Sequence, residues 1–155
     1  MRNKQKGFSL IELLIVVAII LIIAAIAIPN LLRSKIAANQ ASAVGSLRTL
    51  NTSCIAYSTS YGTFPSALTN LGPVGSGGTA SSTSADLVDS VLAAGTKSGY
   101  TFVYTPGASN QSYTITATPI TAATTGQNMY FTDQSGVIRV DTSGSGAGAS
   151  STPIG

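Results

Sequence analysis

The sequence predicts an α+β protein, in which a long N-terminal α-helix packs against a small C-terminal antiparallel β-sheet. Three observations predict this fold. The stretch Phe8–Ile28 contains only two polar residues, Ser9 and Glu12. A helical pattern of apolar residues then continues as far as Tyr61. From Gly99 onward the apolar residues alternate with period two, which is typical of strands with one buried face.

Residues 8–34 are predicted to form the transmembrane half of the helix, preceded by a short basic leader, residues 1–7. All 16 residues of Leu13–Ile28 are apolar, and about 20 residues suffice to cross a bilayer. More basic residues precede the apolar stretch than closely follow it, which favours a cytoplasmic N-terminus and an exported C-terminal part. These basic residues are Arg2, Lys4 and Lys6 before it, and Arg33 and Lys35 after it.

Residues 35–61 are predicted to form the amphipathic half of the same helix. Pro29 is expected to kink the helix without ending it, because the helical pattern resumes beyond it. A helix from Phe8 to Tyr61 would be roughly 80 Å long. Its first half has to be covered by lipid and then by other copies of the chain. The predicted apolar stripe comprises Ile36, Ala43, Leu47, Leu50, Cys54, Tyr57 and Tyr61.

Residues 62–98 are predicted to form a loop that contains one short helix. Gly62 and Pro65 end the long helix, and Gly75–Ser84 is a low-complexity run. We expect a helix over Ala85–Ala94, with Ser84 as its N-cap and Gly95 beyond its end.

Residues 99–141 are predicted to form an antiparallel β-meander, and residues 142–155 a flexible tail rich in serine and glycine. Asp133–Gly136 has the composition of a hairpin turn between the last two strands. The four expected strands are Tyr100–Thr105, Ser112–Thr118, Met129–Thr132 and Val137–Asp141.

The composition argues against an enzyme and against a cofactor. The chain has no histidine and one cysteine, Cys54. This excludes histidine-based acid–base and nucleophilic catalysis, Cys-based metal cages and an intrachain disulfide. Only 8% of the residues are charged.

The basic net charge does not indicate a nucleic-acid partner. Three of the eight basic residues lie in the leader, before Gly7. If the chain is cut after Gly7, five basic side chains face five acidic ones, so the formal charge of +3 falls to zero. The basicity therefore belongs to the leader and not to a binding surface.

The hexapeptide Gly7-Phe8-Ser9-Leu10-Ile11-Glu12, followed by the apolar stretch and Pro29, resembles the class III signal of type IV pilins and of type II secretion pseudopilins. The resemblance covers residues 1 to about 65 and implies a pilin-like fold. It also implies that a prepilin peptidase cuts between Gly7 and Phe8 and N-methylates Phe8. Ordinary signal-peptidase cleavage after Ala25-Ile26-Ala27 is the alternative, and it would remove the apolar helix.

Glu12 is the strongest single candidate for a functional residue, and the role that we expect for it is in assembly. A carboxylate within a membrane helix costs about 2.5–3.5 kcal/mol on insertion scales, so it requires a partner. The resemblance implies that Glu12 pairs with the N-terminal amine of Phe8 on a neighbouring subunit. The alternative is that Glu12 lies near the interface and extends toward lipid headgroups.

Four aspartates are weak candidates for calcium ligands, because carboxylate oxygens are the ligands that this ion prefers. The segment Asp133-Gln134-Ser135-Gly136 is explained more simply as a turn with Asp and Gly in favoured places. The four are Asp86, Asp89, Asp133 and Asp141.

Taken with the resemblance, these features predict a non-enzymatic structural subunit of a type IV pilus. The implied partners are further copies of the chain, the prepilin peptidase and methyltransferase, an inner-membrane assembly platform, and the lipid bilayer before assembly. The implied location is first the inner membrane and then the cell surface. A pseudopilin that forms a periplasmic piston of type II secretion is the main alternative, and a membrane-anchored enzyme or binding module is the third.

Overall fold

The computed structural model describes residues 7–154 and shows the predicted α+β fold. Helix α1 spans Leu10–Tyr61 and helix α2 spans Ser90–Ala93, with 3-10 turns η1 (Leu68–Leu71) and η2 (Ala108–Asn110). By compactness the chain divides into two units, Met1–Lys35 and Ile36–Gly155. The strands are β1 (Thr96–Lys97), β2 (Tyr100–Pro106), β3 (Tyr113–Pro119), β4 (Met129–Asp133), β5 (Arg139–Asp141) and β6 (Thr152–Pro153).

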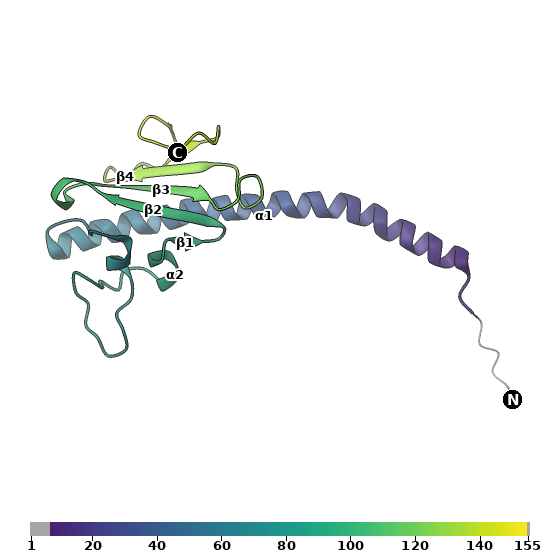
Figure 1. Cartoon of the computed structure of the whole chain (residues 1–155), viewed down its shortest axis with the longest axis horizontal. Helices are drawn as coiled ribbons and strands as arrows, with labels where there is room; N and C mark the ends of the chain where they lie inside the picture. The colour runs from purple at the N-terminus through teal and green to yellow at the C-terminus, as the bar shows by residue number, and fades with distance from the viewer. Residues whose placement is uncertain (1–6, 155) are drawn as a thin grey trace. The chain divides into compact units, whose positions relative to one another are not determined.

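The six strands form one sheet in which each strand pairs with the next one in sequence, always antiparallel (Figure 1). The pairing of β2 with β3 is the longest, from Tyr100 opposite Pro119 to Pro106 opposite Tyr113. The predicted meander is therefore confirmed, but the prediction of four strands was wrong. The missed strands β1 and β6 are two residues long, too short to show an alternating pattern.

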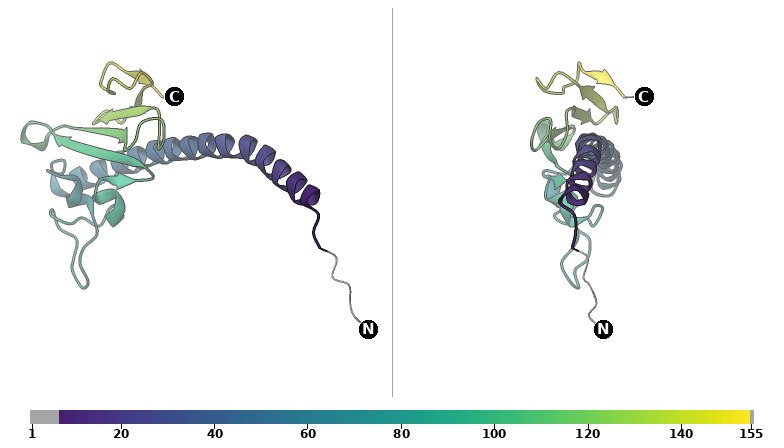
Figure 2. Two further views of the ribbon diagram at one scale, coloured as in Figure 1. Left: turned by 45° about the vertical axis from the view of Figure 1, so that its right-hand side comes forward. Right: turned by 90° about the vertical axis from the view of Figure 1, so that its right-hand side faces the viewer.

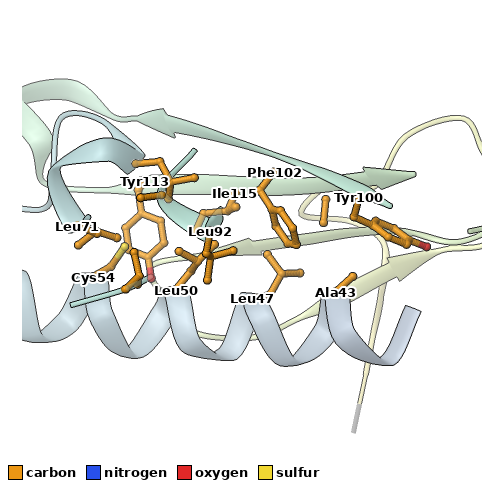
Figure 3. Packing of buried hydrophobic residues seen from close by; sticks show 14 of the residues in the cluster. Ala43, Leu47, Leu50, Cys54, Leu71, Leu92, Tyr100, Phe102, Tyr113 and Ile115 are labelled. Atoms are coloured by element: carbon orange, nitrogen blue, oxygen red, sulfur yellow. The ribbon is translucent and has the colours of Figure 1, made fainter. Parts of the chain in front are cut away.

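The core of the second unit lies between the sheet and one face of α1 (Figure 3). Along α1 the buried apolar residues recur at helical spacing, and alternate residues of β2 and β3 lie opposite them. Figure 2 shows the sheet and the segment that contains α2 on different sides of the C-terminal half of α1. The central buried residues are Ala43, Leu47, Leu50, Cys54 and Tyr57 of α1, Tyr100 and Phe102 of β2, and Tyr113, Ile115 and Ala117 of β3.

The predicted apolar stripe is confirmed in its middle and wrong at its two ends. Ile36 is only partly buried and Tyr61 is exposed. The sheet covers the helix over a shorter length than the pattern of apolar residues occupies. Three polar residues of α1 are buried beside the stripe, namely Ser46, Asn51 and Ser53.

The expected helix over Ala85–Ala94 was wrong at its N-terminal half. Residues 85–88 bond to the loop around η1 instead, with Ala85 N–H donating to Asn70 O at 2.8 Å and Leu87 N–H to Leu71 O at 2.9 Å. The N-cap is Asp89, whose carboxylate accepts from Leu92 N–H at 2.8 Å, and not Ser84. The hydroxyl of Ser84 donates to Pro73 O across the loop. The predicted glycine stop is confirmed, because Gly95 follows α2 with a φ of +80°.

The C-terminal segment was predicted to lack secondary structure, and the structure instead places β6 within it. Ile154 N–H donates to Ile138 O at 2.8 Å, and the Arg139 guanidinium donates to Ser151 O at 3.1 Å. Ile154 also packs against the core. A single isoleucine and a few backbone hydrogen bonds therefore attach a segment whose composition resembles a linker.

The predicted turn at Asp133–Gly136 is confirmed. Gly136 N–H donates to Asp133 O at 2.9 Å, and Gly136 has a φ of +75°, which favours glycine. The turn is attached to α1 through the side chain of Asn51. Its amide donates to Thr132 Oγ1 at 2.8 Å and to Gly136 O at 3.3 Å, and its oxygen accepts from Tyr113 Oη at 3.0 Å.

Asn51→Ala is expected to destabilise the second unit by roughly 2–4 kcal/mol, because it leaves the buried hydroxyls of Thr132 and Tyr113 without a partner. Chemical denaturation of the purified full chain in detergent measures the loss. Ser42→Ala is the matched control, since it also removes a helix–loop hydrogen bond, Ser42 Oγ to Ser98 Oγ at 2.9 Å, but an exposed one. Equal losses of unfolding free energy in the two variants would contradict the larger contribution that we expect from the buried hydrogen bonds of Asn51.

The buried thiol of Cys54 makes stability fall at alkaline pH. Burial raises its pKa from 9.0 to about 12, and burial likewise raises the pKa of Tyr100 to about 12. The folded state thus favours the protonated forms, whereas the unfolded chain ionises from about pH 9. This contribution is complete below pH 9 and is lost as the pH rises toward 12. We expect the denaturation midpoint to fall between pH 8 and pH 10.5, and less steeply in Cys54→Ala; an unchanged midpoint would contradict this.

Candidate processing and assembly site

At the N-terminus of α1, Glu12 forms one half of a capping box with Ser9, which was not predicted from the sequence. The helix was predicted to begin at Phe8, but it begins at Leu10, with Ser9 in the N-cap position. Ser9 O accepts from Leu13 N–H at 3.2 Å, and Ser9 N–H donates to Glu12 Oε2 at 2.8 Å. The signal was present in the sequence, because Ser-x-x-Glu before an apolar run is the pattern of this cap.

The peptide bond between Gly7 and Phe8 lies outside the helix. Residues 7–9 lie outside every helix and strand, and Phe8 is 82% exposed. A Cβ atom added to Gly7 would meet nothing within 4 Å. The bond at which processing is expected is therefore exposed and non-helical in this structure. The rest of the leader, residues 1–6, lies outside the described residues.

The first half of α1 presents apolar side chains on all sides. The large apolar residues between Leu10 and Ile28 are 46–74% exposed. By length and composition α1 contains a window that is able to cross a membrane, although a signal sequence would meet the same test. Pro29 lies inside α1, which continues beyond it. Because proline has no N–H, the carbonyl of Ala25 lacks its usual helical partner there.

Three of the four aspartates, namely Asp89, Asp133 and Asp141, accept hydrogen bonds in separate local contacts. Asp89 caps α2 and pairs with the Lys97 ammonium at 2.9 Å. The hydrogen bond from Lys97 and that from Leu92 N–H lower the pKa of Asp89. Asp133 accepts from Ser135 N–H at 2.9 Å within the hairpin turn. Asp86 has a left-handed backbone, with a φ of +55°.

Asp141 stabilises the turn that follows β5. Its carboxylate accepts from the Ser143 hydroxyl at 2.7 Å and from Gly146 N–H at 3.1 Å. These bonds, that from the Ser143 hydroxyl first, lower the pKa of Asp141. Within residues 7–154, no three acidic or thiol side chains gather as a metal site. The structure thus does not bring the four aspartates together.

Comparison with known proteins identifies the N-terminal motif. A family model described as the prokaryotic N-terminal methylation motif matches residues 2–28. The chain is 67% identical over 39 residues to the type IV wide pilus major component PilA4 of Thermus thermophilus, covering 25% of this chain and 29% of that protein. It is 52% identical over 59 residues to the type IV major fimbrial protein FimA of Dichelobacter nodosus, covering 36% and 37%.

A third relative is the type IV major pilin protein PilA of Myxococcus xanthus, 51% identical over 49 residues that cover 32% of this chain and 22% of that protein. Each match thus spans well under half of the relative's own length. No solved structure gives a significant match. In the segment that these comparisons cover, the chain carries the N-terminal methylation motif and is similar to type IV pilins.

Proposed function

We propose that the chain is a structural subunit of a type IV pilus, cut after Gly7, N-methylated at Phe8 and polymerised through its N-terminal helix. The observation that carries this proposal is the combination of the methylation motif with an apolar helix that is exposed along its length. An exposed helix of this kind is stable only when lipid or other apolar surfaces cover it. A polymer of identical helices supplies such surfaces outside the membrane.

Cleavage before the apolar stretch leaves the helix on the mature chain and creates a new amine at Phe8. Removing the leader also removes its three cations, so the apolar stretch keeps Glu12 as its single charged side chain. In the assembled pilus, Glu12 pairs with the Phe8 amine of a neighbouring subunit. That pair offsets the cost of burying two charges and sets the axial position of each subunit.

Before assembly, the capping box gives the Glu12 carboxylate a partner on its own chain. The bond from Ser9 N–H and the positive end of the helix dipole lower the cost of placing this carboxylate near the bilayer. In the inner membrane, the Glu12 carboxylate of a single chain is therefore already partly stabilised by its own chain. On assembly, the Phe8 amine of the neighbouring subunit becomes a partner of the Glu12 carboxylate, either beside Ser9 N–H or in its place.

The partners of this cycle are the prepilin peptidase and methyltransferase, the lipid bilayer, an inner-membrane assembly platform and further copies of the chain. The three relatives are named as pilus or fimbrial proteins, which favours a surface pilus over the periplasmic piston of a pseudopilin. The proposed location is the inner membrane first and the cell surface after assembly.

Electron microscopy of material sheared from the cell surface tests this function. We expect long fibres whose subunit, by mass spectrometry, begins at a methylated Phe8. A strain lacking the chain should have no such fibres and should regain them on complementation. Fibres that lack the chain, or an absence of fibres together with a secretion defect on deletion, would contradict the proposal, the second in favour of the piston.

A further inference from the structure

The outer face of β2 and β3 consists almost entirely of threonine. Alternate residues of these strands, such as Phe102 and Ile115, point toward α1 and are buried (Figure 3). The residues between them therefore lie on the opposite side of the sheet, away from the core. In register across the two strands they form three pairs, which we call the threonine face: Thr101–Thr118, Val103–Thr116 and Thr105–Thr114.

The hydroxyl groups of the threonine face are available to a partner. No hydrogen bond between residues 7–154 involves the side chain of any of its five threonines. On α1, by contrast, the exposed Thr49, Thr52 and Thr59 each donate to a backbone carbonyl of the helix. Because a hydroxyl both donates and accepts, a surface of this kind complements a second copy of itself. The six residues of the face also carry no charge, so two copies meet without like-charge repulsion.

The face is too small to hold two single chains together. From residue 101 to residue 105 a strand rises about 14 Å, and neighbouring strands lie about 5 Å apart, so the face covers on the order of 200 Å². A stable interface buries about 800 Å² on each partner. A filament repeats the face once in every subunit, and many weak contacts then act together. The face is thus suited to contacts between filaments and not between single chains.

We infer that the threonine face of one filament binds the threonine face of another, so that filaments associate side by side. This inference rests on the proposed function, because only a polymer presents the face many times. Threonine and valine are β-branched, and such residues pack well on a pleated surface. A polysaccharide is the less favoured partner. The aromatic side chains of Tyr100, Phe102 and Tyr113 are buried on the other side of the sheet, so the face offers no ring to stack on a sugar.

Placing one charge in the face tests the inference. Val103→Lys puts a cation at its centre, and because the face meets its own copy, two cations would meet in each contact. Val91→Lys is the matched control, since Val91 is 54% exposed on α2, outside the face, and Val103 is 51% exposed. Electron microscopy and low-speed sedimentation of sheared filaments measure the fraction that is bundled.

We expect Val103→Lys to lower the bundled fraction at least about tenfold and Val91→Lys less than about twofold, with the total amount of filament unchanged in both. Wild-type filaments that remain single would overturn the inference, and so would equal loss of bundling in the two variants. Wild-type cells without any filaments would instead contradict the proposed function, so the two failures are distinguishable.

Mixing oppositely charged filaments shows whether the face meets itself. Filaments of Val103→Lys and of Val103→Glu should each stay apart, and their mixture should bundle, because each contact then joins a cation to an anion. A mixture that stays apart would overturn the inference. Thr105→Lys, at an exposed position of the same face, takes the place of Val103→Lys if that variant forms no filament. Loss of filament in both would show that the face is needed within the filament, which would also overturn the inference.

Discussion

Glu12→Ala is expected to leave the chain in the membrane and to abolish filaments. Alanine removes a carboxylate whose insertion costs about 2.5–3.5 kcal/mol, so membrane insertion should improve. In the filament, the same change leaves the neighbouring Phe8 amine buried without its partner. Breaking a buried ion pair costs about 3–5 kcal/mol, which corresponds to roughly a 100-fold or greater loss in the affinity of each subunit for the growing end.

Glu12→Gln separates the two roles that we propose for this side chain. The glutamine oxygen is still able to accept the hydrogen bond from Ser9 N–H, so the capping box is preserved, but the negative charge is lost. Quantifying sheared filament beside membrane-bound, processed subunit distinguishes the roles. We expect both variants to lose filament and both to insert. Wild-type amounts of filament with Glu12→Gln would show that capping, and not charge pairing, is what assembly requires.

The long helix and the core stripe were predictable because they follow from periodic apolar residues. Leu47, Leu50 and Cys54 were expected on one face and are fully buried. The same holds for Tyr113, Ile115 and Ala117, whose alternation predicted the buried face of β3. In each case many residues carry the same signal, so a misplaced one does not alter the conclusion.

The missed elements depend on contacts between distant residues. β6 exists because Thr152 pairs with Val140 and Ile154 reaches the core, and neither contact is visible in a Ser/Gly-rich segment. The first half of the expected helix over Ala85–Ala94 was lost because the loop around η1 supplies acceptors for those N–H groups. Local propensity was overruled by tertiary hydrogen bonding.

The candidate site was predictable to a different degree at each residue. Gly7, Phe8 and Glu12 were expected from the motif, and the structure adds where they lie with respect to the helix start. The role of Ser9 was missed because the apolar run was taken to begin the helix at Phe8.

Gly7→Phe is expected to block processing almost completely while leaving the fold unchanged. Gly7 lies before the helix, and an added Cβ there meets nothing within 4 Å, so we expect the substitution to leave the fold of the described residues intact. A failure to be cut would therefore reflect the fit of this residue to the peptidase. We expect the full-length precursor to remain in the inner membrane, with its three leader cations and without a methyl group on Phe8.

Intact-mass measurement of the membrane fraction checks this result, with Gly7→Ala as a graded control that adds one methyl group at the same open position. We expect Gly7→Ala to be cut more than Gly7→Phe and less than the wild type. A mature mass that begins at Phe8 in Gly7→Phe would remove Gly7 from the recognition of the cleavage site. A wild-type chain that begins after Ala27 would contradict the assembly proposal as well. The exported chain would then lack the apolar helix through which we propose that it polymerises. Retention of Phe8–Ala27 on the exported subunit is therefore the requirement that the processing and assembly proposals share.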